Sequence, residues 1–232
     1  MGQARFRELL ADETAQPPLD EVSLAISSAL RPGLDTTECL ATMEMLAAEC
    51  PWPDPPRTGP PSPEDVAEYL FGHHGFTGNQ DAYYDWRNSC LDRVLATETG
   101  IPISLSILMI EIGRRVDVEL VGVGMPSHFL VGVAGDPNRF FDPFNGGRRL
   151  DRGAARALFD ELTGGRIPWR ESHLQPTPNR AIAIRVLNNL KAIFSQQPDR
   201  VRYGIIMQLR GSIAELRTAE ADAIVEATAI FN

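Results

Sequence analysis

One histidine and one aspartate stand at positions that could form a catalytic pair. His128 opens a run typical of a β-strand, and Asp142 lies near the end of the next such run. With a four-residue turn between the runs, both side chains can lie on one face of a hairpin. A carboxylate that orients an imidazole fixes its tautomer and stabilises its charged form, as a general base requires. The alternative is structural: His128 hydrogen-bonds locally, and Asp142, which precedes Pro143, caps a turn.

Such a pair needs a nucleophile, and the sequence offers two side chains. Ser104 stands at the start of a predicted helix, where the helix N-terminus stabilises developing anions. Cys90 falls in the first turn of a shorter predicted helix, where the pKa of a thiol is lowered. Each has a more ordinary alternative. Ser104 would cap its helix, and Cys90 would be a small buried hydrophobic residue.

The adjacent histidines His73 and His74 indicate a metal site only weakly. Adjacent side chains point in different directions, and no Cys or His follows at a ligand spacing. Asp81 and Asp85 nearby are ordinary loop residues. A metal-dependent hydrolase would need these histidines to converge with His128 from a distant segment. The sequence therefore predicts neither a metal nor a cofactor.

The helices that must position these residues follow from the spacing of apolar side chains. Helical spacing before residue 50 predicts two short helices, separated at Arg31–Gly33. Ser62 and Pro63 begin another helix, with carboxylates in its first turn. Ser89 with Asp92 matches a capping box and predicts a helix over 90–98. The run 105–116 is apolar almost all round, which predicts a buried central helix.

After the predicted central helix, the spacing of apolar side chains changes from that of a helix to that of β-strands. Short β-branched and aromatic runs at 118–123, 129–133 and 139–142 predict strands, with a further possible strand at 148–150. The turn Gly135–Asn138 favours antiparallel pairing. Helical spacing returns from Arg180 onward. Helices packed beside an antiparallel sheet predict an α+β fold with a helical tail.

Composition restricts the classes to which the chain can belong. Its 232 residues correspond to one large domain or two small ones. Lys+Arg 22 against Asp+Glu 31 gives a net charge of −9, so nucleic acid is not an expected partner. No secretory signal or membrane span is apparent, and three cysteines argue against a disulfide scaffold. We therefore expect a soluble, cytoplasmic protein without a membrane partner.

A series of short motifs in a fixed order resembles one protein family. The motifs are Gly75-Phe76-x-Gly78-Asn79, Tyr83-Tyr84-Asp85, Asn88-Ser89-x-Leu91, Val94-Leu95, Gly100-Ile101-Pro102-Ile103-Ser104-Leu105, Gly122-Val123-Gly124-x-Pro126-x-His128-Phe129-Leu130-Val131, Asp142-Pro143-Phe144-Asn145-Gly146-Gly147 and Leu187-Asn188-Asn189-Leu190-Lys191. Over roughly residues 65–195 they resemble the SirB-type branch of the transglutaminase-like superfamily. The resemblance implies a papain-like α+β core, in which a central helix packs on an antiparallel sheet and His and Asp lie on neighbouring strands.

The resemblance also implies a chemistry, with one departure. Transglutaminase-like enzymes place a nucleophilic cysteine at the N-terminus of the central helix, where this sequence has Pro102. His128 and Asp142 correspond to the histidine and aspartate of the family triad. The branch as a whole is similar in lacking the cysteine. Asn88, Pro102 and Phe144 stand in the matched motifs and are expected to contribute to the binding site.

Four parts of the chain are expected. They are an N-terminal helical segment at 1–49, a Pro-rich connector at 50–63, a transglutaminase-like domain at 64–174 and a helical tail at 175–232. Proline at the density of the connector excludes helix and central strand. The tail has room for little more than one helix-turn-helix repeat of about 34 residues, so we expect it to pack on the domain.

Two functions remain open at this stage. The first is an enzyme of acyl-transfer type, catalysing amide or thioester hydrolysis, aminolysis or cyclisation on a small-molecule, peptide or carrier-bound acyl substrate. His128 would be its base, and the segment 102–104 its oxyanion site. Ser104 or Cys90 as nucleophile would depart from the family pattern. The second function is a non-catalytic module that binds a peptide or protein partner. An enzyme requires His128 and Asp142 to lie within hydrogen-bond distance and to face an open cleft.

Overall fold

The segment before residue 50 is helical for most of its length. The structure, a computed structural model, describes residues 2–14, 16–50 and 61–231. The first helices are α1 (Gly2–Leu9), α2 (Leu19–Leu30) and α3 (Thr36–Glu49). The predicted break at Arg31–Gly33 separates α2 from α3, whereas the sequence pattern does not predict α1. Of the predicted connector at 50–63, residues 51–60 lie outside the described residues.

Short elements lead from Ser62 to the central helix. As predicted, Ser62 caps α4: its hydroxyl accepts from the Asp65 N–H at 3.2 Å, and its own N–H donates to the Asp65 carboxylate at 2.7 Å. The predicted capping box at Ser89 is wrong, because Ser89 ends a 3-10 turn and Cys90 takes the N-cap position of the next helix. The elements are α4 (Pro63–Ala67), a π-helical turn (Glu68–His73), β1 (Thr77–Gly78), a 3-10 turn (Trp86–Ser89), α5 (Leu91–Thr97) and β2 (Thr99–Gly100), parallel to β1.

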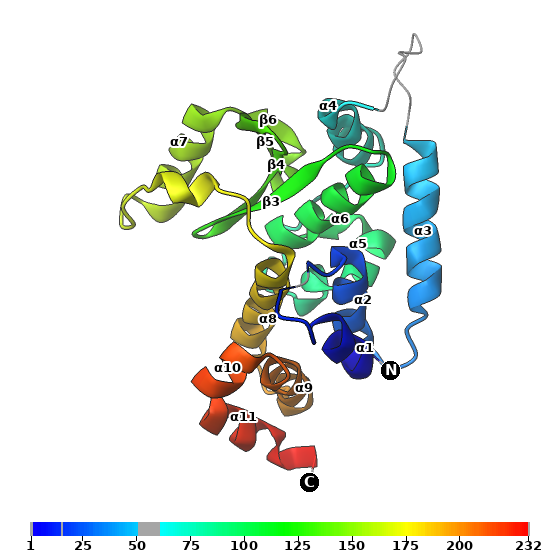
Figure 1. The fold of residues 1–232 in the computed structure, drawn as a ribbon, viewed down its shortest axis with the longest axis vertical. Coiled ribbons are helices and arrows are strands. Elements are labelled where there is room, and N and C mark those ends of the chain that lie inside the picture. Colours follow the sequence, from blue (N-terminus) through cyan, green and yellow to red (C-terminus); the bar gives the residue numbers. More distant parts are fainter. Residues whose placement is uncertain (1, 15, 51–60, 232) are drawn as a thin grey trace.

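A central helix and an antiparallel sheet form the middle of the molecule (Figure 1). The helix α6 (Pro102–Arg115) is buried at every residue from Pro102 to Gly113, as its apolar pattern predicts. It packs against the first two strands of a sheet whose order is β3-β4-β5-β6. The strands are β3 (Leu120–Met125), β4 (His128–Val133), β5 (Asp136–Asp142) and β6 (Arg148–Leu150), with a 3-10 turn (Pro143–Asn145) between the last two.

The remaining helices follow the sheet in the sequence. The helix α7 (Arg152–Thr163), which the sequence pattern does not predict, packs beside β5, and a 3-10 turn (Glu171–Leu174) follows it. The tail then contains α8 (Asn179–Ser195), α9 (Arg200–Gly211), α10 (Ala214–Ala219), α11 (Ala221–Thr228) and a final 3-10 turn (Ala229–Phe231). The helix α8 packs on α2, α6 and β3.

Two hydrophobic clusters lie on opposite faces of the sheet. Phe129, Val131 and Phe141 belong to a large cluster that also contains buried residues of the first three helices, α6, α8 and α9. Leu130 and Phe140, which alternate with them along β4 and β5, belong to a smaller cluster with α7. This alternation is the two-residue period of a strand with both faces covered. The main core is therefore built jointly by the first helices, the sheet and the tail.

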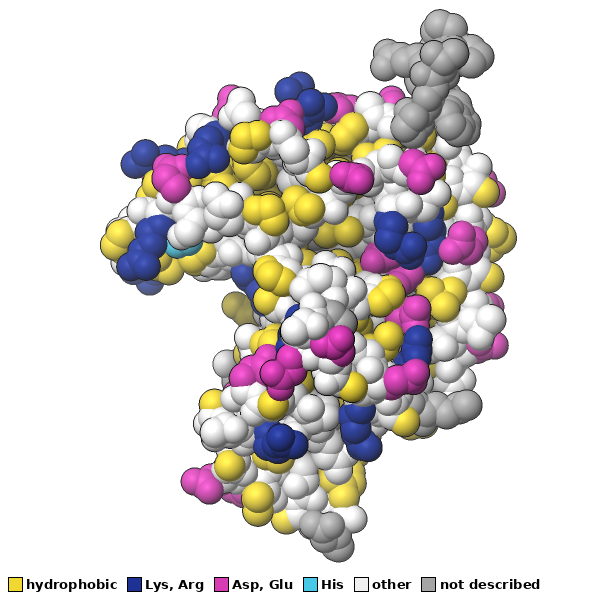
Figure 2. Space-filling view, in the orientation of Figure 1, with side chains coloured by type: hydrophobic (Ala, Val, Ile, Leu, Met, Phe, Trp, Pro, Cys, Tyr) yellow, Lys and Arg dark blue, Asp and Glu magenta, His cyan; other side chains and the backbone are white. Residues whose placement is uncertain are grey.

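The architecture confirms the predicted fold class, an α+β protein with a buried central helix on an antiparallel sheet and helices before and after it. Figure 2 shows that the surface is hollowed between the part that carries the sheet with α7 and the part formed by the tail helices. In the described ranges, every helix is too short or too polar to cross a bilayer.

Candidate functional site

A tight hairpin brings the predicted histidine and aspartate together. Pro126 and Ser127 form a two-residue connection that pairs Met125 with His128 across β3 and β4. Ser127 has φ 63°, the left-handed conformation that the second position of such a turn can require. At the end of β5, the Asp142 carboxylate lies beside the imidazole, with His128 Nε2 and Asp142 Oδ1 2.9 Å apart.

The Asp142 carboxylate is held on both of its oxygens. Its side chain has no exposed surface, and Oδ2 accepts from Asn145 Nδ2 at 2.7 Å and from Arg148 Nη2 at 3.4 Å. Burial alone would raise the pKa of Asp142, but the hydrogen bond from His128, its charge and the Asn145 and Arg148 donors outweigh burial and lower it. Asp142 is thus an ionised acceptor at neutral pH.

This geometry determines which nitrogen of His128 is basic. An ionised carboxylate can only accept, so the proton shared with Asp142 is on Nε2, and in the neutral imidazole the lone pair is on Nδ1. The His128 side chain keeps 5% of its surface exposed. The Phe144 ring stands edge-on to the imidazole, with centroids 6.2 Å apart. Nδ1 is therefore the nitrogen available for proton transfer.

Two aromatic rings lie between the imidazole and a pocket. Phe144 contacts Tyr83 at a centroid distance of 5.7 Å, and Tyr83 lines a pocket of about 260 Å³. Ile101, the residue before α6, also lines it, so the pocket adjoins the N-terminus of the central helix. The other lining residues are Tyr84 and, from α8 and its end, Asn189, Ala192, Ile193, Gln196 and Gln197. His128 is separated from this pocket by Phe144 and Tyr83, so the pair meets the hydrogen-bond distance that an enzyme requires but does not line this pocket.

Ser104 lies at the predicted place but is occupied. Its hydroxyl accepts from the Ile101 N–H at 3.1 Å and donates to the Asn88 carbonyl at 2.6 Å, with 2% of the residue exposed. These contacts cap α6, which is the alternative to a role of Ser104 as nucleophile. The side chain of Asn88 is also engaged, because it accepts from Asn79 Nδ2 at 3.0 Å and donates to the Ala82 carbonyl at 2.7 Å. Both residues hold the loop before α6 against the helix.

The expectation of a lowered pKa at Cys90 is wrong. The residue has no exposed surface, and burial raises the pKa of its thiol to about 12. Cys90 is the N-cap residue of α5, but removal from water outweighs any effect of the helix start. Pro102 is the first residue of α6. An N–H group at this position has no acceptor within the helix, so proline, which lacks it, costs the helix no hydrogen bond. The candidate thiol is thus buried at the start of α5.

No metal centre is formed by the part of the chain that the structure describes, since no three His, Cys, Asp or Glu side chains converge there. His74 instead packs edge-on against Tyr69, with centroids 4.6 Å apart.

Sequence reasoning missed three polar neighbours of the pair. Asn145 and Arg148 bind the Asp142 carboxylate, and Arg185 on α8 binds the backbone of His128. A signal existed for Arg148, because the predicted turn at Asn145–Gly147 places the next strand beside Asp142, and the register pairs Asp142 with Arg148. Arg185 could not be placed in this way, because it reaches the site from the tail.

Comparison with curated proteins finds bacterial relatives whose name states no activity. The chain is 42% identical over 134 residues to a UPF0162 protein of Xylella fastidiosa, and 32% identical over 131 residues to one of Vibrio cholerae. Both matches cover 56% of this chain and 48% of the relative, so the chain spans about half the length of these relatives. A shorter match, 44% identical over 68 residues, covers 29% of this chain and 11% of human F-box only protein 21.

The family assignment rests on a longer match. No solved structure matches the chain. The profile of the Transglutaminase-like superfamily matches residues 37–188, which include α6, the whole sheet and the His128–Asp142 pair. With its central helix on an antiparallel sheet, the chain belongs to the transglutaminase-like superfamily.

Proposed function

We propose that the chain is a transglutaminase-like enzyme of acyl-transfer type that works without a cysteine. The observation that carries the proposal is the 2.9 Å contact between His128 Nε2 and the buried, ionised Asp142 carboxylate. This contact leaves Nδ1 as a base of defined tautomer. On the order of the motifs quoted above, we also propose that the chain belongs to the SirB-type branch.

In the proposed reaction, His128 Nδ1 takes the proton of a water molecule or of a substrate amine or hydroxyl as that group attacks the acyl carbon. The tetrahedral intermediate then collapses, and the same proton passes to the departing nitrogen, oxygen or sulfur. Amide or thioester hydrolysis, aminolysis and cyclisation differ only in the attacking group. Asp142 balances the imidazolium charge during the step and does not itself exchange a proton.

The start of α6 is the proposed oxyanion site. The first helical hydrogen bond runs from the Leu105 N–H to the Ile101 carbonyl, so the N–H groups of Ile103 and Ser104 precede the helical ladder. Pro102 contributes no N–H. Direct attack is proposed instead of a covalent acyl-enzyme, because Ser104 caps the helix and the Cys90 thiol is buried.

A second candidate is a non-catalytic module that binds a peptide or protein partner. The observation that favours it is the pocket beside Tyr83 and Ile101, whose lining includes neither His128 nor any other ionisable group except tyrosine. In that case the His128–Asp142 pair would serve only to hold the hairpin.

The two candidates are separated by His128→Ala, assayed by the cellular function that deletion of the gene abolishes. His73→Ala is the matched control, because His73 is exposed and belongs neither to the pair nor to the pocket beside Tyr83. An enzyme loses that function in His128→Ala although the variant remains folded, and the control keeps it. Full function in folded His128→Ala would rule out the acyl-transfer proposal and favour the binding module.

A further inference from the structure

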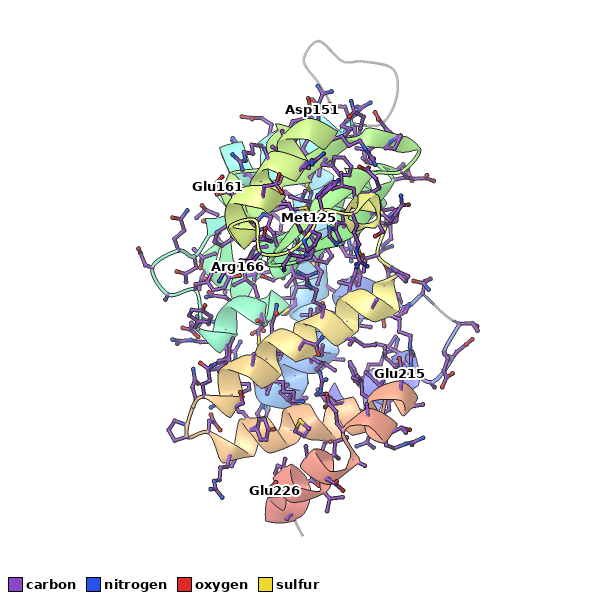
Figure 3. All side chains as sticks on the ribbon, turned by 90° about the vertical axis from the view of Figure 1, so that its left-hand side faces the viewer. Met125, Asp151, Glu161, Arg166, Glu215 and Glu226 are labelled. Atoms are coloured by element: carbon purple, nitrogen blue, oxygen red, sulfur yellow. The ribbon has the colours of Figure 1, made fainter. Side chains whose placement is uncertain are left out.

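The turn that carries His128 is held from outside by the tail helix α8. Arg185 Nη2 donates to the Met125 carbonyl at 2.6 Å and to the His128 carbonyl at 2.7 Å. These carbonyls belong to the two residues that flank the Pro126–Ser127 turn. Figure 3 shows Met125 within the part of the molecule that carries the sheet, next to α8. One guanidinium thus fixes both ends of the turn.

Arg185, which is half-buried, differs from the buried Arg210 of the tail in having no acidic partner among the described residues. Arg210 on α9 pairs with Glu220, whereas no carboxylate of the described residues lies within ion-pair distance of Arg185. The guanidinium lies over the Phe129 ring, 5.4 Å from its centroid, and burial lowers the pKa of Arg185. Its desolvation is therefore offset by backbone carbonyls and an aromatic face.

The edge of β3 is shaped to admit this side chain. A Cβ atom at Gly124 would lie 2.9 Å from Arg185 Nη1 and 3.1 Å from Thr177 Oγ1, so the glycine provides the space. Thr177 fixes the same edge, since its hydroxyl accepts from the Gly124 N–H at 2.9 Å and its own N–H donates to the Gly122 carbonyl at 2.7 Å. Four residues of β3 and β4 are thus held by Arg185 and Thr177 from the tail side.

We infer that Arg185 is a positioning residue for His128, which lets the tail helix set the orientation of the imidazole toward Asp142. The importance of this role for catalysis rests on the proposed function, whereas the contacts of Arg185 with the turn do not depend on it. Fixing the carbonyl of His128 restricts the backbone from which its ring projects. The 2.9 Å contact between His128 Nε2 and Asp142 Oδ1 depends on a fixed backbone. A small shift of the backbone would move the ring farther than the geometry of a hydrogen bond tolerates.

The test follows the His128 imidazole by NMR in the full chain, which has only four histidines to assign. In wild type, the Nε2-bound proton donated to Asp142 should give a resonance that exchanges slowly with water. Arg185→Met keeps the apolar stem and removes both donors. Gly124→Ala displaces the flexible end of the guanidinium and also crowds the Thr177 hydroxyl, so Arg185→Met is the more selective of the two variants. In both variants we expect exchange of this proton to quicken roughly tenfold or more, comparable with the loss of one charge-assisted hydrogen bond.

Arg180→Met is the matched control. Arg180 lies on the same helix, donates to the Leu10 carbonyl at 3.0 Å and pairs with Glu215, but within the described residues it makes no hydrogen bond to β3 or β4. A change in Arg185→Met and Gly124→Ala without a change in Arg180→Met supports the inference. An unchanged resonance in Arg185→Met overturns it, and so does an equal change in Arg180→Met, because general loosening of the tail would explain both.

This result is independent of the assay for the proposed function. If His128→Ala leaves the cellular function intact while Arg185→Met still alters the resonance, the positioning role holds and the enzymatic role fails. If His128→Ala abolishes the function while Arg185→Met leaves the resonance unchanged, the enzymatic role holds and the positioning role fails.

Discussion

Replacing Asp142 by asparagine tests the arrangement of the pair most directly. The amide has the shape of the carboxylate but only one acceptor oxygen. If that oxygen faces His128, the new NH₂ group meets Asn145 Nδ2, which donates to Asp142 Oδ2 at 2.7 Å in the wild type, so two donors oppose each other. If the amide turns round, its NH₂ faces His128 Nε2 and forces the imidazole proton onto Nδ1. Asp142→Asn must therefore lose one of two strong contacts.

The magnitude follows from the burial of the site. A hydrogen bond to a charged group contributes about 1.5–3 kcal/mol, so Asp142→Asn should lower the free energy of unfolding by about that amount at pH 7. For a chain of this size, about 1 kcal/mol corresponds to roughly 2–4 °C, which predicts a fall in melting temperature of about 3–12 °C. Urea unfolding and thermal melting both measure the effect.

The dependence on pH has a defined sign. The pKa of Asp142 is lowered from its ordinary value of 3.8, so its contribution to stability is complete above pH 3.8 and is lost as the pH falls below that value. The gap between wild type and Asp142→Asn should close in that range. Asp136→Asn is the control, because Asp136 lies on the same strand with 35% of its side chain exposed; its pair with Arg139 is screened by solvent, so its loss should change stability little. A gap that is absent at pH 7, or equal at pH 7 and pH 3, would refute the reasoning.

Three further measurements bear on the site and the tail. Pro102→Cys places a thiol at the buried start of α6; any modification by iodoacetamide at pH 6 should be roughly tenfold faster than in the double variant with His128→Ala, and equal rates would contradict the proposed place of the oxyanion site beside His128. The native Cys90 thiol should resist iodoacetamide at pH 8 and react only after unfolding in urea, because it is buried with a pKa of about 12; mass spectrometry detects the label. The Arg210 guanidinium lowers the pKa of Glu220 to about 2, so Glu220→Gln should cost about 1 kcal/mol at pH 7, and urea unfolding should show this cost shrinking as the pH falls from 4.5 toward 2.

The central elements and the His128–Asp142 pair could be predicted because their signals are local. An apolar run without a polar face can only be a buried helix, and β-branched runs bounded by turn residues give strands whose order follows the chain. The position of His128 before one strand and of Asp142 at the end of the next then determines their proximity. Only the lengths of the strands and turns are needed for this inference.

The elements and residues that were missed depend on contacts between distant segments. The helix α1 has few apolar residues and is fixed by packing on α2, where a Cβ at Gly2 would lie 2.5 Å from the Ala29 backbone nitrogen. Arg185 reaches His128 across 57 residues of sequence. For Cys90, the local signal of a helix start was present, but burial by the surrounding core determined its pKa. Packing thus overrides local pattern at these positions.

The shared core of the first helices and the tail has a consequence for folding during synthesis. The Arg180 side chain binds the Leu10 carbonyl 170 residues away, and Gln3 binds Gln208. At about 5–20 residues per second, the apolar face of α2 would wait about 8–30 s on the ribosome before α8 is made. Until then this face has no complete cover, so a nascent chain that stalls before residue 175 would be prone to aggregate or to bind a chaperone. The speed of translation through the sheet would therefore influence the yield of native protein.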